Sequence, residues 1–91
     1  MALRRTLTIV NQRGLHARAS ARFVNAVAAL PPGVSVRVAK DGHEAAGGSI
    51  LGLMMLGAAK GDEVTIRASG DGAPQALDAL CGLVEGKFGE D

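Results

Sequence analysis

The stretch NQRGLHARASARFVNAVAAL, residues 11–30, contains a change from a strand-like pattern to a helical one. From Ala17 to Leu30 the apolar residues recur at helical spacing, which predicts an amphipathic helix with one buried stripe. The PPG sequence at residues 31–33 is typical of a helix end. His16 and Arg18 stand where this helix is expected to begin. Three roles are open for this histidine: it caps the helix, it binds a metal, or it reacts with an anion.

Strand patterns lie on both sides of this predicted helix. Residues 3–10 alternate apolar side chains with Thr and Arg, and residues 34–40 alternate Val with Ser, Arg and Ala. The Asp-Gly pair at residues 41–42 indicates a hairpin, with a short return strand at residues 43–47. Residues 62–69 show a fourth alternating pattern. The sequence therefore predicts four strands.

Two further helices are expected. Ser49 follows two glycines and precedes the apolar residues 50–56, which predicts a short helix with Ser49 as its N-cap. A last helix is predicted from apolar residues at helical spacing, namely Leu77, Leu80, Cys81, Val84 and Phe88. The resulting order, β-α-β-β-α-β-α, favours an α+β fold with one sheet and helices on one of its faces. We expect residues 1–91 to form a single domain.

The composition excludes several classes of protein. The 10 basic and 9 acidic residues give a formal net charge of +1, and Tyr and Trp are absent. No nucleic-acid partner is expected, because such proteins concentrate basic residues and aromatic stacking platforms. No stretch is apolar enough for a membrane span, and the N-terminus lacks a signal-peptide core. We therefore expect a cytoplasmic protein. Cys81 is the only cysteine, so no internal disulfide can form.

His16 at a helix start suits chemistry on an anion. The first N–H groups of a helix have no intrahelical acceptor, and they add about half a unit of positive charge. Arg18 adds a guanidinium that can hold phosphate oxygens in a bidentate manner. This positive environment favours a neutral imidazole, and a neutral imidazole can attack phosphorus. The pattern therefore indicates a phosphate site at His16.

Other interpretations of the same residues stay open at this point. By position alone, a histidine near a helix start is more often a surface or capping residue. Metal binding is disfavoured, because His43 is the only other histidine and no Asp or Glu lies near His16 in the sequence. No orienting carboxylate for a general base is evident either. Arg18 and Arg22 could simply form a solvated helix face.

Two separated motifs resemble those of a known family. GLHAR after the first strand is similar to the active-site signature of HPr, the histidine-containing phosphocarrier of the phosphotransferase system. SILGLMMLGAAKGDEVTI resembles the second signature of that family. The length, the element order and the last helix agree as well, so the resemblance covers essentially the whole chain. The LMML…AKG segment is most similar to the NPr branch, the nitrogen-related carriers.

The resemblance implies a fold and a set of roles. It implies an open-faced β-sandwich, with a four-stranded antiparallel sheet covered by three helices. It makes His16 the phosphorylated residue, through Nδ1, Arg18 its phosphate-orienting partner, and Ser49 the regulatory serine. Enzyme I is the implied donor and a IIA-type protein the acceptor, while an HPr kinase/phosphorylase is a further implied partner. Ala19 departs from the family pattern, which usually has proline there.

The predicted second helix also suggests where partners dock. A short helix buries only one face, and Leu53 and Leu56 suit that face. Four other apolar side chains are then left at least partly exposed, namely Ile50, Leu51, Met54 and Met55. Exposed apolar patches of this kind mark docking surfaces, and in the family partners dock around the first two helices, where Arg22 also lies.

We expect a carrier rather than an enzyme, with no cofactor and no metal. The alternative is a regulatory protein-interaction module in which phosphorylation only switches partner binding.

Overall fold

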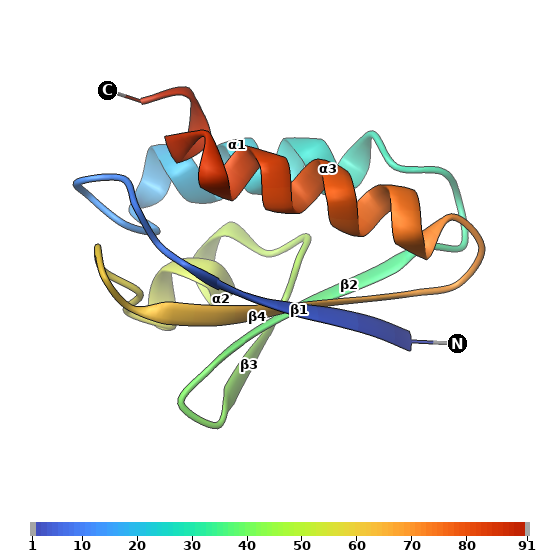
Figure 1. Ribbon diagram of the computed structural model, residues 1–91, viewed down its shortest axis with the longest axis horizontal. Helices are drawn as coiled ribbons and strands as arrows, with labels where there is room; N and C mark the ends of the chain where they lie inside the picture. Colours follow the sequence, from blue (N-terminus) through green and yellow to red (C-terminus); the bar gives the residue numbers. More distant parts are fainter. Residues whose placement is uncertain (1, 91) are drawn as a thin grey trace.

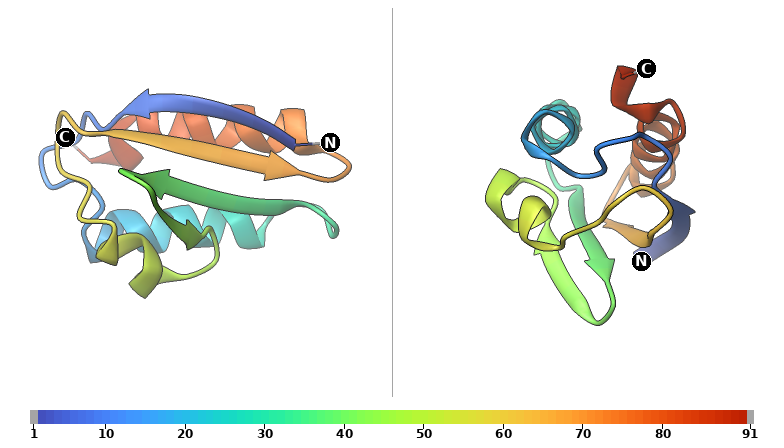
Figure 2. Two further views of the ribbon diagram at one scale, coloured as in Figure 1. Left: turned by 90° about the horizontal axis from the view of Figure 1, so that it is seen from below. Right: turned by 90° about the vertical axis from the view of Figure 1, so that its left-hand side faces the viewer.

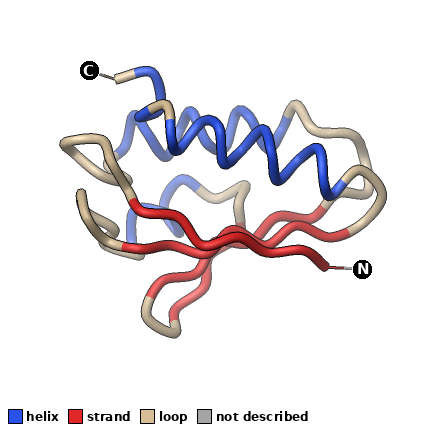
Figure 3. Tube along the Cα trace, in the orientation of Figure 1, coloured by secondary structure: helices blue, strands red, loops and turns tan. Residues whose placement is uncertain are grey.

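The computed structural model describes residues 2–90, and its elements follow the predicted order. In chain order they are β1 (Ala2–Thr8), α1 (Ala17–Ala28), β2 (Ser35–Lys40), β3 (His43–Ala46), α2 (Ile50–Met55), β4 (Glu63–Ser69), α3 (Ala73–Glu85) and the 3₁₀ turn η1 (Lys87–Gly89). Figure 1 shows this arrangement along the chain, and Figure 3 shows the same view coloured by secondary structure.

The four strands form one antiparallel sheet with the order β1-β4-β2-β3. All three helices lie on the same face of this sheet, and the other face is left open (Figure 2). The predicted α+β open-faced sandwich is therefore confirmed. α1 and α3 run side by side across the sheet, while the short α2 lies beside α1 near β3 (Figures 1 and 2).

Alternation in the strands explains why one face is covered and the other is not. In β4, Val64 and Ile66 are buried under the helices, whereas Arg67 between Ile66 and the next buried residue is exposed. On the open face, the hydroxyls of Thr6 and Thr65 are 2.9 Å apart across the β1–β4 pair. Because successive side chains of a strand point to opposite faces of the sheet, each strand presents polar side chains to the open face and apolar side chains to the helices.

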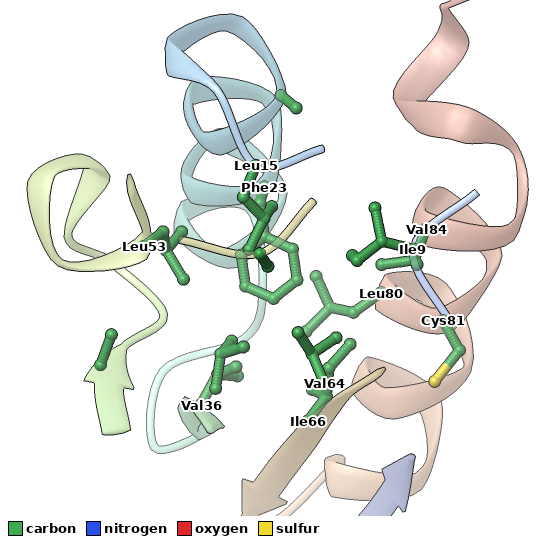
Figure 4. Close-up of a cluster of buried hydrophobic side chains, with 14 of the residues drawn as sticks. Ile9, Leu15, Phe23, Val36, Leu53, Val64, Ile66, Leu80, Cys81 and Val84 are labelled. Carbon is green, nitrogen blue, oxygen red and sulfur yellow. The ribbon is translucent and has the colours of Figure 1, made fainter. Parts of the chain in front are cut away.

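The core is built between the sheet and the two long helices. Phe23 of α1 and Leu80 of α3 point toward one another above Val64 and Ile66 of β4 (Figure 4). Leu53 of α2 closes the side of this cluster and is fully buried. The core thus fixes where the first turn of α1 lies relative to the rest of the molecule.

The structure corrects one prediction about the last helix. Phe88 is fully buried, as its spacing suggested, but α3 ends at Glu85 and Phe88 belongs to η1. The chain changes direction after Gly86, because Lys87 and Phe88 adopt left-handed backbone angles with φ of 59° and 55°. This turn brings the end of the chain back toward the start of α1 (Figure 1).

Candidate functional site at the start of α1

His16 is the N-cap residue of α1, at the position the sequence predicts. Its backbone is extended, with φ −74° and ψ −177°, and its carbonyl accepts the first helical hydrogen bond, from Ser20 at 2.9 Å. The ring nitrogen Nδ1 accepts a hydrogen bond from the backbone N–H of Arg18 at 3.3 Å. Nδ1 therefore faces the N–H groups at the positive end of the helix.

The two residues before His16 hold the loop in place. Gly14 has a φ of +61°, and a Cβ there would lie 2.2 Å from the carbonyl oxygen of Ala58, so only glycine fits. The N–H of Leu15 donates to that same oxygen at 2.9 Å, and the Leu15 side chain is buried in the core. The loop after α2 thus anchors the GLH sequence and directs the imidazole outward.

No pattern in the sequence indicates a carboxylate at the imidazole, but the structure contains one. Oε2 of Glu90, from the end of the chain, lies 2.6 Å from Nε2 of His16. The other oxygen, Oε1, accepts from the side-chain amide of Asn11 at 3.0 Å. The Asn11 hydrogen bond, then the His16 contact and the charge of Arg18, hold the pKa of Glu90 below its usual range. Glu90 is therefore a carboxylate at neutral pH.

Beside His16 lies an arginine-rich hollow of about 350 Å³, which we call the cationic hollow. Its lining residues are Gln12, Arg13, Arg18, Arg22, Gly89 and Glu90. The guanidinium of Arg22 donates to the carbonyl oxygen of Phe88 at 2.7 Å, so it also holds the chain terminus. Guanidinium groups and helix N–H groups are the donors that bind phosphate in proteins. The arrangement suits an anionic phosphoryl group next to Nδ1.

Ser49 is the N-cap of α2, as predicted. Its Oγ accepts a hydrogen bond from the N–H of Gly52 at 2.9 Å. Leu53 is fully buried and Leu56 partly buried, so the predicted inward face of α2 is confirmed. The exposed apolar side chains on the outside of α2 are those expected, with exposed fractions of 41% for Ile50, 67% for Leu51, 40% for Met54 and 77% for Met55. We call these four residues the α2 patch.

Other candidate groups lie away from this site. Cys81 is buried, and burial raises the pKa of its thiol, which keeps it in the unreactive protonated form. Within residues 2–90 no three His, Cys, Asp or Glu side chains are grouped so that they could hold a metal ion. Over the same residues, no helix has the length and apolarity needed to cross a membrane.

Comparison with known proteins identifies the family. The PTS-HPr family, described as the PTS HPr component phosphorylation site, matches residues 3–86. The chain belongs to the HPr family. Its phosphotransferase-system relatives include the phosphocarrier protein HPr of Cupriavidus necator, which is 39% identical over 88 residues, covering 97% of each chain. The phosphocarrier protein NPr of Shewanella violacea is also 39% identical, covering 97% of this chain and 94% of its own.

A solved HPr structure agrees with this assignment. The crystal structure of HPr from Thermoanaerobacter tengcongensis superposes with a TM-score of 0.90 at 38% identity, covering 98% of both chains. The relatives match over nearly their whole length, so the likeness extends beyond the two motifs. The chain is a phosphocarrier of the phosphotransferase system.

Proposed function

We propose that His16 carries the phosphoryl group on Nδ1, receives it from phosphorylated Enzyme I and passes it to a histidine of a IIA-type protein. One observation carries the proposal. The two ring nitrogens have different surroundings, because Nε2 contacts Glu90 at 2.6 Å whereas Nδ1 accepts a longer hydrogen bond of 3.3 Å from the Arg18 N–H. Nδ1 is therefore the nitrogen with a lone pair that can be released for attack on phosphorus.

The helix start provides for the charge that arrives with the phosphoryl group. When Nδ1 bonds to phosphorus, the N–H of Arg18 is freed to donate to a phosphoryl oxygen. The exposed Arg18 side chain supplies two parallel donors, and Arg13 adds a further positive charge in the cationic hollow. These groups orient the phosphoryl group without enclosing it.

An open site is what a carrier requires. His16 has a side-chain exposure of 23%, enough for a partner's reacting group to approach it. A phosphoryl group held too tightly would not be passed on, because binding that is stronger in the loaded state raises the barrier to transfer. These features support a carrier within a relay, and we place this carrier in the cytoplasm and propose that it is not itself an enzyme.

The α2 patch and Arg22 are the proposed docking surface for both partners. Ser49 stands at the edge of this surface, and its phosphorylation by an HPr kinase/phosphorylase would place about two negative charges at the start of α2. The negative charge is favourable at the N-terminus of the helix. It opposes docking, however, because a partner that covers the apolar surface would have to desolvate the phosphate. Ser49 is thus the proposed regulatory residue.

Radioactive phosphoenolpyruvate and Enzyme I test the assignment of the phosphoryl-accepting residue. The protein is expected to take up one label that is lost in mild acid and survives base, as a phosphoramidate does. Proteolytic mapping should locate the label in the peptide that contains His16. A label that is stable in acid, or that maps to a peptide without His16, would refute the proposal.

A further inference from the structure

Residues 88–90 are anchored against the start of α1 by several contacts. Phe88 is fully buried in the core, although its backbone adopts the strained left-handed conformation. Its carbonyl oxygen accepts from the Arg22 guanidinium at 2.7 Å. The next residue, Gly89, lies so close to that guanidinium that a Cβ would approach Nη1 to 2.5 Å. These contacts leave Glu90 little choice of position.

Asn11 determines how the Glu90 carboxylate is oriented. Asn11 is fully buried, and its amide nitrogen donates both to Oε1 of Glu90 at 3.0 Å and to the carbonyl oxygen of Gly14 at 2.9 Å. Its own Oδ1 is buried without a hydrogen-bond partner in the described part of the chain. If the Asn11 amide were flipped, Oδ1 would face two acceptor oxygens and both hydrogen bonds would be lost. Leaving Oδ1 unpaired therefore costs less than losing the hydrogen bonds that hold Glu90 and Gly14.

The carboxylate in turn assigns the proton on the imidazole. A carboxylate only accepts, so the 2.6 Å contact requires that Nε2 of His16 carries the hydrogen. Nδ1 accepts the N–H of Arg18, which agrees with a lone pair at that nitrogen. The Glu90 side chain is only 14% exposed, so solvent competes weakly for this hydrogen bond. Both ring nitrogens thus have roles fixed by their neighbours.

We propose that Glu90 is a positioning residue for phosphoryl transfer: it holds His16 with Nε2 protonated and stabilises the positive charge that the ring acquires in the reaction. The inference rests on the proposed function of His16. In the transfer, the Nδ1 lone pair forms the N–P bond while the bond from phosphorus to the donor atom breaks, and its electron pair leaves with the donor. The Nε2 proton stays in place, so the ring becomes positive opposite the carboxylate. A carboxylate that orients a histidine and stabilises its imidazolium is an established device.

The arrangement assigns a role to a segment distant in sequence from the reacting nitrogen. Glu90 contacts Nε2 of His16 and not Nδ1, so it acts on the reaction through the ring. Phe88, Arg22 and Asn11 act one step further away, by holding Glu90. If the terminus merely stabilised the fold, removing the Glu90 carboxylate would leave the ring and the transfer rate unchanged.

A pair of matched variants tests this role. Glu90→Ala removes the carboxylate, whereas Glu85→Ala removes an exposed one from the last residue of α3 and changes the net charge equally. The Nε2–H proton of His16 should give a downfield, slowly exchanging nitrogen-coupled NMR signal in the wild type and in Glu85→Ala. The signal should be lost in Glu90→Ala, while core amide signals show that the fold is retained.

Transfer measured by rapid quench gives the second readout. At saturating phosphorylated Enzyme I, Glu90→Ala should be slower by about tenfold, the lower end of the loss when a metal-bound histidine loses the group that orients it, with the KM for Enzyme I unchanged. Glu90→Gln, which keeps the size of the side chain but not its charge, should also be slower. Glu85→Ala should match the wild type.

Two results would overturn the inference. One is a Glu90→Ala protein that transfers at the wild-type rate, and the other is an equal loss in both alanine variants, which would reveal a nonspecific charge effect. The ring-proton signal is recorded without any donor. A wild-type protein that shows the signal but takes no label at His16 would therefore refute the proposed function while confirming the contact with Glu90.

Discussion

The first turns of α1 and α2 begin in the same way but differ in what surrounds them. His16 and Ser49 are both N-caps with extended backbones, and each accepts a hydrogen bond from a nearby helical N–H. Around His16 lie the cationic hollow and the Glu90 carboxylate. Around Ser49 lies the α2 patch of exposed apolar side chains. The same local device thus occurs in a polar, charged setting and in an apolar one.

A helix N-terminus therefore does not define a reactive site by itself. The backbone N–H groups of α1 and α2 are chemically equivalent, and α2, with six residues, is the shorter helix. What distinguishes α1 is an imidazole at the cap, guanidinium groups beside it, and a carboxylate within hydrogen-bond distance of the ring. Variants at the two caps can therefore separate reactivity from helix stability.

Replacing each of the two cap residues with alanine in turn should change labelling and stability the most. His16→Ala should abolish labelling by phosphorylated Enzyme I, because the accepting nitrogen is gone. Ser49→Ala should keep full labelling but lower the free energy of unfolding by about 1 kcal/mol, the usual cost of losing a serine N-cap. Labelling assays and urea denaturation measure the two quantities. Residual labelling in His16→Ala would mean that another residue accepts the phosphoryl group.

The next largest effect is expected at Arg18. Arg18→Lys keeps the positive charge but loses the bidentate geometry, so one charge-assisted hydrogen bond to the phosphoryl group disappears. A loss of about 1.4 kcal/mol corresponds to about tenfold in rate. Quenched-flow transfer should show this slowing without a change in stability. Arg4→Lys, on the open face of the sheet, is the control and should transfer normally; equal slowing in both would contradict a specific role for Arg18.

At α2 the expected effect is smaller and concerns binding. Ser49→Asp keeps a good N-cap, so stability should stay close to wild type, but it adds negative charge beside the α2 patch. Met54→Lys places a charge within the patch. Both variants should need several-fold more Enzyme I for half-maximal transfer, with the rate at saturation unchanged. Met54→Leu, which stays apolar, is the control. Unchanged half-saturation in Ser49→Asp and Met54→Lys would show that partners dock elsewhere.

Local signals made much of this molecule predictable from its sequence. Alternation predicted the four strands, and glycine followed by serine predicted the start of α2, because both features depend on neighbouring residues. The exposure of the α2 patch followed from the size of the helix, since six residues cannot bury every apolar side chain. His16 at the cap of α1 was predictable for the same local reason.

The end of the chain was not predictable in this way. Phe88 continues the helical spacing of Leu80 and Val84, and only the left-handed turn after Gly86 separates it from α3. Glu90 reaches His16 across a separation of 74 residues, which no periodicity encodes. The glycines on either side of Phe88 were the one local sign of a turn. The carboxylate at the ring is a product of tertiary packing.

The smallest effect is expected at Ala19, where the chain departs from the family proline. Ala19 is the third residue of α1, and its N–H has no intrahelical acceptor, so proline would remove no helical hydrogen bond there. The fully buried Ala19 leaves little free space, and proline disfavours the helical conformation of the residue before it. Proline also restricts the unfolded chain, which raises the free energy of unfolding. Ala19→Pro should therefore leave stability near the wild-type value and transfer equal or slightly faster, as measured by urea denaturation and rapid quench. An unfolded variant would mean that the start of α1 cannot accept the family residue without further changes.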